Sequence, residues 1–448
     1  MCIGLSQRCF EIRRERLGFA MKYVIIGNGI ASIGAIEGIR KVDTENEILV
    51  IGSEDSPAYG RPLISYLLAG KIGPERLSLR PKEFYEKSNV TLKLGTTVTG
   101  IDTSAKTVLT EKGETIEFEN LLIATGGIPF TPPIPGSDGI DVYNFTNLDH
   151  AQQLISKAKD IKRAVVIGGG LIGLKAGESL FDRGVDVTIL ELSPRILSLA
   201  FDENAASLAG ARLEEVGLNV RCGVSAKEIQ RDSDGNLKGV HLTDGDFLQA
   251  DAVVIAIGVV PNYNLAKESG IAVDRGIKVD DNMCTSAESV FAAGDVAQAK
   301  DLLFGDDRVI PIWTNAYNQG FCAGKNMAGS CIEFTGSLAM NSISFYGLPT
   351  ISVGTVNPPE NDVSYEVATS LDQKKKSYRK LVFKDDRMVG YVLVGDIDMA
   401  GMYTAFVKFQ MAVPEDAKKQ ILAGEPDVLM WPDDFFKETW NPGWEEQD

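Results

Sequence analysis

The stretch from Ala164 to Glu191, AVVIGGGLIGLKAGESLFDRGVDVTILE, constrains the fold of this chain more than any other feature. It opens with a short apolar run and continues with Gly168, Gly170 and Gly173 at G-x-G-x-x-G spacing. A helix-like segment and a second apolar run follow. This order of strand, tight turn, helix and strand is the context in which a glycine fingerprint binds a dinucleotide. The sequence therefore predicts a nucleotide-binding βαβ unit here.

Each residue of this fingerprint has an expected role. Gly168 forms the tight turn, Gly170 lets the backbone approach a pyrophosphate, and Gly173 lets the helix pack on the strand. Glu191 lies about twenty residues further on, where a carboxylate binds the adenosine ribose hydroxyls. A 2′-phosphate there would repel the carboxylate by about 4 kcal/mol at a separation of about 4 Å and an effective dielectric constant near 20. The sequence therefore predicts NAD(H) in preference to NADP(H).

A second pattern of the same kind lies near the N-terminus. An apolar run at 23–26 precedes Gly27 and Gly29, and Ser32 stands at the position of the third glycine. Glu54 follows the next apolar run. Serine is small, so we expect slightly looser helix packing and a retained site. Two such units in one chain indicate an internal duplication and two bound nucleotides.

Composition limits the classes of function. The formal net charge of −17 argues against binding to nucleic acid or to anionic membrane surfaces, and no apolar run is long enough to span a bilayer. The six cysteines form no C-x-x-C pair and no metal-ligand cluster, so we interpret them as reduced thiols of a cytoplasmic protein. Only two histidines are present, which argues against a histidine-based catalytic triad or metal site.

The two ends differ from the rest of the chain. Charged residues interrupt any apolar core within residues 1–20, so we exclude this segment from the fold as an upstream start or a disordered arm. Residues 431–448 are acidic and contain three of the four tryptophans. This tail is expected to pack on the C-terminal domain or across a homodimer, or else to dock a partner subunit.

Six motifs together resemble those of a known family: GNGIAS, YGRPLIS, LLIATGGIP, GGGLIGLKAGESL, AIGVVPN and FAAGDVA. They are similar to the pyridine nucleotide–disulfide oxidoreductase superfamily of flavoproteins. Within it, the chain most resembles the branch of NADH oxidases, rubredoxin reductases and the flavin portion of NADH nitrite reductases. The resemblance covers roughly residues 22–411.

The resemblance implies an α/β fold with two Rossmann-like, three-layer domains, one for FAD and one for NAD, and a C-terminal α+β domain. The implied domains are a discontinuous FAD-binding domain at 21–131 and 262–333, an NAD-binding domain at 132–261, and an interface domain at 334–430.

The resemblance also implies which residues contact the cofactors. Gly27 and Gly29 would cradle the FAD pyrophosphate, Glu54 would bind its adenosine ribose, and Asp295 would accept a hydrogen bond from its ribityl chain. Gly258 would border the nicotinamide. The remaining implied cofactor-binding positions are Ser32, Arg61, Ala124, Thr125, Gly126, Gly294 and Trp313.

Two cations are the implied catalytic residues. Arg61 occupies a position where the family places a basic residue near the flavin ring, and a cation there would stabilise negative charge on reduced flavin. Lys175 stands where the family commonly has an acid. It could make the flavin pocket more positive, or it could point away and pair with Glu178 or Glu191.

Two further positions have an alternative interpretation. Asp295 could cap a helix N-terminus as well as bind the ribityl chain. Trp313 could lie under the flavin, or it could be a buried core residue.

Departures from the family exclude some of its chemistry. No cysteine lies between Cys9 and Cys222, so the paired cysteines of the disulfide reductases are absent, as is the single cysteine expected near Ser65. No histidine follows His241 to act as a C-terminal base. What remains is direct flavin chemistry, with hydride accepted from NADH and electrons passed on.

Three functions are therefore open. The first is an FAD-dependent NADH:acceptor oxidoreductase with a protein redox partner, or the NAD-linked flavoprotein subunit of a larger redox complex, as a homodimer or hetero-oligomer. The second is a self-sufficient NADH oxidase that reduces oxygen. The third is a non-catalytic flavin-binding sensor. The sequence does not name the acceptor.

Overall fold

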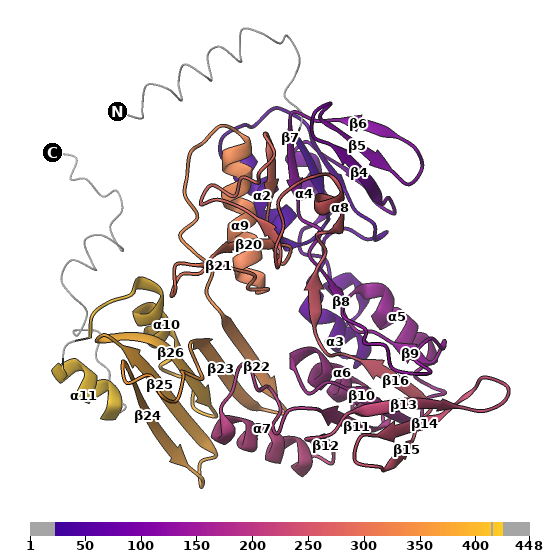
Figure 1. Cartoon of the computed structure of the whole chain (residues 1–448), viewed down its shortest axis with the longest axis vertical. Helices are drawn as coiled ribbons and strands as arrows, with labels where there is room; N and C mark the ends of the chain where they lie inside the picture. Colours follow the sequence, from indigo (N-terminus) through magenta and orange to yellow (C-terminus); the bar gives the residue numbers. More distant parts are fainter. Residues whose placement is uncertain (1–22, 414, 424–448) are drawn as a thin grey trace. The chain divides into compact units, whose positions relative to one another are not determined.

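The computed structural model describes residues 23–413 and 415–423, so the arm at 1–20 and the tail at 431–448 lie outside the described residues. The described chain divides into two compact units. One contains residues 23–198 and 213–339, and the other contains residues 199–212 together with the described residues from 340 onward. The labels of the helices and strands are those of Figure 1.

The first sheet of the larger unit has five parallel strands in the order β19-β7-β1-β2-β3. The strands are β1 (Tyr23–Ile26), β2 (Ile48–Ile51), β3 (Val90–Lys93), β7 (Asn120–Ile123) and β19 (Val290–Ala292). Except for the edge strand β3, they are buried along their whole length. Burial on both faces explains why they are continuous apolar runs without alternation.

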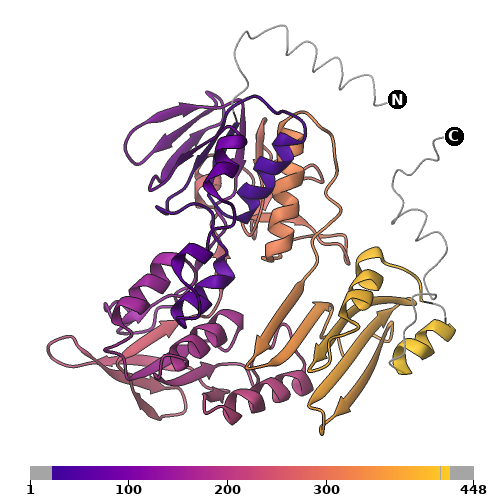
Figure 2. The same cartoon turned by 180° about the vertical axis from the view of Figure 1, so that it is seen from behind.

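Two helices cross closely beside this sheet, and both views show them side by side (Figures 1 and 2). They are α2 (Ile30–Arg40) and α9 (Trp313–Met327). A Cβ atom added to Gly34 would lie 2.3 Å from the Tyr317 carbonyl oxygen, and one on Gly320 would lie 2.0 Å from the Ala31 carbonyl oxygen. Glycine is therefore needed at this crossing because the two backbones are in contact.

The second sheet of the same unit has parallel strands in the order β12-β11-β10-β16-β9. They are β9 (Val142–Tyr143), β10 (Arg163–Ile167), β11 (Asp186–Glu191), β12 (Asn219–Cys222) and β16 (Ala252–Ile255). Helix α6 (Leu171–Phe181) connects β10 to β11, and α5 (Leu148–Lys157) follows β9. Both fingerprints thus lie between a buried strand and a helix, as the sequence predicts.

Smaller elements complete this unit. One three-stranded antiparallel sheet contains β4 (Val98–Asp102), β5 (Thr107–Thr110) and β6 (Thr115–Glu117), and another contains β13 (Ala226–Arg231), β14 (Leu237–Leu242) and β15 (Phe247–Gln249). The ribbon of β8 (Gly127–Pro129) and β17 (Val259–Pro261) joins the two nucleotide-binding segments. The other strands are β18 (Ile277–Lys278), β20 (Ala297–Lys300) and β21 (Asp307–Arg308). The short helices are η1 (Arg61–Leu63), α3 (Ile64–Leu68), η2 (Pro74–Arg76), α4 (Lys82–Lys87) and α8 (Asn264–Glu268).

The smaller unit is built on an antiparallel sheet in the order β22-β23-β26-β25-β24. Its strands are β22 (Met340–Phe345), β23 (Leu348–Gly354), β24 (Tyr365–Asp372), β25 (Ser377–Lys384) and β26 (Arg387–Val394), and its helices are α10 (Ala400–Phe409) and α11 (Glu415–Ala423). Residues 199–212, which contain most of α7 (Glu203–Glu215), also belong to it. Asp202 Oδ2 accepts a hydrogen bond from the Tyr378 hydroxyl (2.6 Å) and pairs with Lys380 Nζ (3.1 Å).

The α/β fold class with a C-terminal α+β domain is confirmed. The NAD-binding domain predicted at 132–261 includes residues 199–212, whereas in the structure these residues belong to the smaller unit. Within the described part of the chain, no helix combines the length and the apolar character needed to cross a membrane. The described acids, cysteines and histidines also form no group that could hold a metal ion.

Candidate nucleotide-binding site

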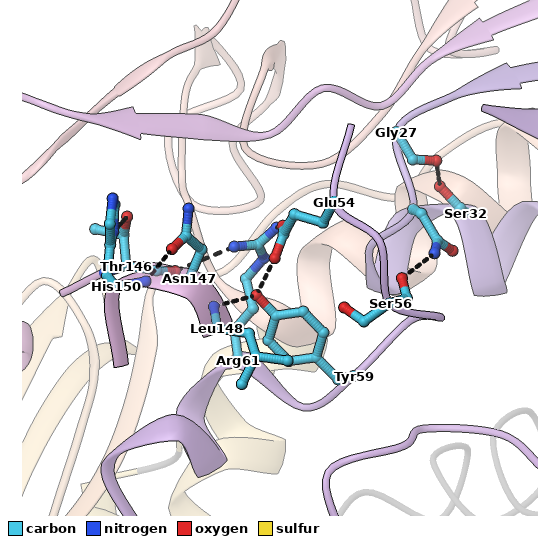
Figure 3. Close-up of polar contacts among 11 residues, drawn as sticks. Gly27, Ser32, Glu54, Ser56, Tyr59, Arg61, Thr146, Asn147, Leu148 and His150 are labelled. Atoms are coloured by element: carbon cyan, nitrogen blue, oxygen red, sulfur yellow. Dashed lines mark hydrogen bonds and ion pairs between the residues drawn. The ribbon is translucent and has the colours of Figure 1, made fainter. Parts of the chain in front are cut away.

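The first glycine turn lies between β1 and α2. Gly27 has φ +108°, and a Cβ atom there would lie 2.1 Å from the Ala124 carbonyl oxygen, so only glycine fits. Ser32, at the third glycine position, donates its hydroxyl to the Gly27 carbonyl oxygen (2.6 Å), which Figure 3 shows. The serine therefore ties the helix to the turn.

The second turn, between β10 and α6, has the same construction. Gly168 has φ +116°, and a Cβ atom there would lie 2.3 Å from the Ala256 carbonyl oxygen. A Cβ atom on Gly173 would lie 1.9 Å from the Gly168 carbonyl oxygen. Helix α6 thus approaches its turn too closely for any side chain, whereas α2 accommodates Ser32.

The middle glycine of each turn is not required by the protein's own geometry, unlike the first glycine. Gly29 and Gly170 precede their helices with φ −112° and −81°, values that any residue adopts. An added Cβ atom would meet no atom of the described chain within 4 Å at either position. Neither backbone strain nor packing therefore requires glycine, and the free space suits a ligand that approaches the backbone.

Two further observations fit a phosphate at these turns. Among the residues that the structure describes, no side chain caps the N-terminus of α2 or of α6, which leaves the first N–H groups available to an anion. In the first turn, Asn28 donates its Nδ2 to the Ser56 carbonyl oxygen (3.0 Å), while its Oδ1 is buried with no hydrogen-bond partner among the described residues. A buried acceptor of this kind normally has a hydrogen-bond donor, and the described chain does not supply one.

Glu191, at the end of β11, is held in place beside the second turn. Its Oε2 accepts the N–H of Gly169 (2.7 Å), and its Oε1 accepts the N–H of Ser193 (2.7 Å). The carboxylate therefore lies next to the fingerprint, and its predicted ribose-binding role stays a prediction.

Glu54 and Arg61 form an ion pair beyond the end of β2 (Figure 3). Arg61 Nη2 lies 2.6 Å from Glu54 Oε1, and the Tyr59 hydroxyl donates to Glu54 Oε2 (2.6 Å). The guanidinium also lies 5.3 Å from the centre of the Tyr59 ring. The sequence did not single out Tyr59 as a site residue, although the YGRPLIS motif contains it.

The same cluster reaches the start of helix α5. Arg61 Nη1 donates to the Thr146 carbonyl oxygen (3.1 Å), and the Leu148 N–H donates to the Tyr59 hydroxyl (2.8 Å). No sequence motif indicated this connection, because the partners are backbone groups more than eighty positions away.

Asp295 lies within the electrostatic reach of Arg61. Burial raises the pKa of the Asp295 carboxyl above its ordinary value, and the Arg61 charge opposes part of that rise. The neighbouring Gly294 has φ +87° and donates its N–H to Gln319 Oε1 (2.8 Å). The alternative role of Asp295 as a helix cap is wrong, because a turn leads from it into strand β20 and no helix follows.

The segment after β7 joins the first sheet to the connecting ribbon. The Ala124 N–H donates to the Ile26 carbonyl (2.7 Å), and the Thr125 hydroxyl donates to the Asn262 carbonyl (2.7 Å). Gly126 has φ +66° and accepts the Asn262 N–H (2.9 Å). Gly258, with φ +120°, accepts the Phe130 N–H (3.0 Å). These four positions therefore have structural roles beside the cofactor contacts that the resemblance implies.

Trp313 is the first residue of α9, and 45% of its surface is exposed. The interpretation of this residue as a buried core tryptophan is therefore wrong. Its exposed ring remains available to a ligand, so the predicted flavin contact stays a prediction.

Lys175 pairs with Glu178, one turn further along α6, at 2.5 Å. Burial raises the pKa of the Glu178 carboxyl, and the Lys175 charge opposes that rise. The structure therefore contains the pairing that the sequence left open as an alternative. A role of Lys175 at the flavin stays a prediction.

Two family models match the chain. One, described as pyridine nucleotide-disulphide oxidoreductase, matches residues 21–320, and the other, described as the rubredoxin NAD+ reductase C-terminal domain, matches residues 340–410. These matches confirm the resemblance drawn from the six motifs.

Individual proteins are also similar to the chain. The assimilatory nitrate reductase electron transfer subunit of Bacillus subtilis is 34% identical over 407 residues, which are 90% of this chain and 51% of that protein. The NADH-dependent phenylglyoxylate dehydrogenase subunit epsilon of Aromatoleum evansii is 34% identical over 82% of this chain and 86% of its own length. The chain thus spans about half the length of some of the curated relatives it matches.

Among solved structures, the ferredoxin reductase for the CYP199A2 system from Rhodopseudomonas palustris is 25% identical. It covers 92% of this chain and 98% of its own, with a TM-score of 0.81. The cofactors of the matched family are FAD and NAD(H), and the two open turns fit two dinucleotides. On its sequence, its fold and the geometry of both turns, the chain belongs to the pyridine nucleotide-disulphide oxidoreductase family.

Proposed function

We propose that the chain is an FAD-dependent NADH:acceptor oxidoreductase that exchanges electrons with a protein redox partner. The observation that carries this proposal is the pair of glycine turns, each with an open middle glycine before an uncapped helix. Bound FAD would supply the redox chemistry, since it can exchange a hydride with NAD(H) and electrons with the partner. The chain would bind both cofactors, orient them and exclude water.

The first sheet would hold FAD. Gly27 and Gly29 would border the pyrophosphate at the N-terminus of α2, and Glu54 would bind the adenosine ribose. Arg61 and Asp295 would bring opposite charges to the same cofactor, since each influences the pKa of the other. The Arg61 side chain is 47% exposed, so its cation is accessible to an anionic group of the ligand.

The second sheet would hold NAD(H). Gly170 leaves room for its pyrophosphate, and the fixed carboxylate of Glu191 would accept hydrogen bonds from its ribose hydroxyls. The negative charge of Glu191 supports NADH over NADPH as the hydride donor.

The described cysteines support a mechanism without a protein disulfide. Cys222, Cys284, Cys322 and Cys331 are free. Burial raises the pKa of Cys284 to about 12 and that of Cys322 to about 11, so neither is a thiolate at neutral pH. Electrons would then pass directly between the flavin and the acceptor.

Names of the relatives support a protein partner. One is an electron transfer subunit, another is a subunit of an NADH-dependent dehydrogenase, and others are rubredoxin reductases. We propose that this chain likewise exchanges electrons with a protein, either a carrier or fixed subunits. The proposed protein is cytoplasmic and forms a homodimer or a hetero-oligomer.

Anaerobic stopped-flow spectroscopy of the FAD-loaded protein tests the proposal. NADH is expected to bleach the flavin rapidly, and a protein carrier such as rubredoxin should reoxidise it faster than air does. Faster reoxidation by air would indicate an NADH oxidase instead. Absence of bleaching would indicate a flavin-binding sensor and would overturn the proposed activity.

A further inference from the structure

The segment that follows β2 contacts both nucleotide-binding parts of the larger unit. Glu54 lies just beyond the end of β2, in the first sheet. Further along the same segment, α3 packs against α5 and α6, which flank the second sheet. The Ser179 hydroxyl of α6 donates to the Ser65 carbonyl of α3 (2.9 Å). A ligand bound at Glu54 is thus connected through a short stretch of chain to the other nucleotide-binding part.

Tyr59 is the centre of this connection (Figure 3). Its side chain is buried, and its hydroxyl contacts both Glu54 Oε2 (2.6 Å) and the Leu148 N–H (2.8 Å). The backbone N–H can only donate, so the hydroxyl accepts from Leu148 and must donate its single proton to Glu54. Burial and the Glu54 charge raise the pKa of the tyrosine, which therefore keeps that proton at neutral pH.

Leu148 is the first residue of α5, where backbone N–H groups lack partners within the helix. Asn147 caps the helix by accepting the His150 N–H on its Oδ1 (2.9 Å). The Tyr59 hydroxyl satisfies a second of these donors. The Asn147 cap therefore fixes the orientation of the N–H that holds Tyr59.

Arg61 adds a second contact to the same helix start. It donates to the Thr146 carbonyl (3.1 Å) while it pairs with Glu54 (2.6 Å). Glu54 is thus positioned by two residues, and each of them is held in turn by backbone groups at the start of α5. A carboxylate positioned in this way loses less conformational freedom when it binds a ribose.

We infer that the capped start of α5 controls FAD retention through Tyr59, although it belongs to the NAD-binding part. Asn147 and Tyr59 are positioning residues that act through Glu54. This inference rests on the proposed binding of FAD at the first sheet. By reciprocity, FAD binding at Glu54 stabilises the start of α5.

A double-mutant cycle on FAD affinity tests the coupling. Flavin fluorescence measures the dissociation constant of FAD for the wild type, Tyr59→Phe, Asn147→Ala and the double variant. Loss of a hydrogen bond to a charged group should weaken FAD binding about tenfold in Tyr59→Phe. Asn147→Ala, which removes a helix cap, should weaken it about threefold to fivefold. In the Tyr59→Phe background, Asn147→Ala should have a clearly smaller effect than in the wild type, because the path through Tyr59 is then broken and only the Arg61 contact with Thr146 still joins the start of α5 to Glu54.

Two control variants accompany the cycle. Tyr66→Phe removes the hydroxyl of a half-exposed tyrosine on α3 and should leave FAD affinity at the wild-type value. Asn147→Ser retains a capping oxygen and should restore FAD binding close to that of the wild type. An Asn147→Ala protein that binds FAD as the wild type does, or one whose effect adds fully to that of Tyr59→Phe, overturns the inference.

Amide hydrogen exchange of the wild-type protein tests the reciprocal effect without any substitution. FAD should slow exchange of the Leu148 amide severalfold, and unchanged exchange overturns the inference. If the wild type fails to bind FAD at all, the proposed function fails instead, so the two failures are distinguishable.

Discussion

The Glu191 carboxylate accepts a hydrogen bond from the Gly169 N–H at 2.7 Å. This contact joins the end of β11 to the glycine turn that follows β10, and Ser193 holds the other carboxylate oxygen. The acid is therefore oriented by two backbone N–H groups of the protein. A negative charge fixed in this way should discriminate between ligands by their charge.

Replacing Glu191 with Gln should narrow the preference for NADH over NADPH. Glutamine keeps an oxygen acceptor but removes the charge, so NADPH should gain more than NADH. The expected change in the ratio of the two kcat/KM values is at least about tenfold, since the lost repulsion amounts to a few kcal/mol before screening. Kinetics of dye reduction with each nucleotide measure the ratio.

Asp186→Asn is the matched control for that experiment. Asp186 begins the same strand and is exposed, so its replacement changes the net charge equally but away from the turn. The ratio should stay at the wild-type value. An equal change in both variants would show that overall charge, and not Glu191, sets the preference.

Alanine at Gly29 or at Gly170 should weaken the binding of one cofactor and leave the binding of the other unchanged. Neither Gly29→Ala nor Gly170→Ala creates a clash with the part of the chain that the structure describes, so both variants should fold with near wild-type stability. The added methyl group would occupy the space expected for a pyrophosphate. Gly29→Ala should therefore weaken FAD binding about tenfold or more, and Gly170→Ala should raise the Kd for NADH similarly with FAD retained.

Titrations of each variant with FAD and with NADH check this separation. Gly210→Ala, at another open glycine in α7, serves as a control that should affect neither. Loss of both cofactors in a single variant would point to general misfolding instead.

The fold and the two turns could be predicted from the sequence because their causes are local. Buried parallel strands require continuous apolar runs, and a turn with positive φ at Gly27 or Gly168 requires glycine. These requirements act over a few neighbouring residues, so they leave a readable pattern.

Other parts of the site depend on contacts between distant segments. The Tyr59 hydroxyl accepts a hydrogen bond from the backbone N–H of Leu148. Nearly every residue has such an N–H group, so no sequence pattern identifies Leu148 as the partner. The same holds for residues 199–212, which join the smaller unit through Asp202. The sequence alone does not choose Glu178 as the partner of Lys175, because Glu191 carries the same charge.

The Lys175–Glu178 pair should stabilise the fold, because the lysine charge compensates for the burial of the Glu178 carboxylate. The Glu178 side chain is only 9% exposed and that of Lys175 is 25% exposed. Lys175→Met would leave the carboxylate without this cation, so the free energy of unfolding should fall by about 1–3 kcal/mol. The double variant Lys175→Met, Glu178→Gln should recover most of the loss. Urea unfolding measures both, and an additive loss in the double variant would contradict this account.

Alkylation of the protein thiols should leave NADH–dye reduction within about twofold of the untreated rate. The reason is that no cysteine lies near Ser65 and that burial holds the pKa values of Cys284 and Cys322 well above neutral. The spectrum of the two-electron-reduced protein provides a second check. A long-wavelength thiolate–flavin charge-transfer band would contradict the prediction.

Protonation of His150 should make the protein less stable in mild acid. Burial lowers the pKa of this imidazole from its ordinary value of 6.5. Its Nδ1 faces the Thr146 N–H at 3.3 Å, an interaction that only an unprotonated Nδ1 can accept. Below pH 6.5 the unfolded chain therefore binds more protons at this position than the folded chain does. The free energy of unfolding should decrease as the pH falls from 6.5 toward the folded-state pKa.

Urea unfolding between about pH 7.5 and pH 5.5 measures this dependence for the wild type and for His150→Asn, whose side-chain oxygen can still accept the Thr146 N–H. One proton contributes a slope of at most about 1.4 kcal/mol per pH unit, and the variant should lack that part of the slope. Buried acids with raised pKa values, such as Glu178 and Asp295, act in the opposite direction because their folded forms bind protons first. Only the difference between the two proteins therefore reports on His150, and identical slopes would exclude this histidine as the source.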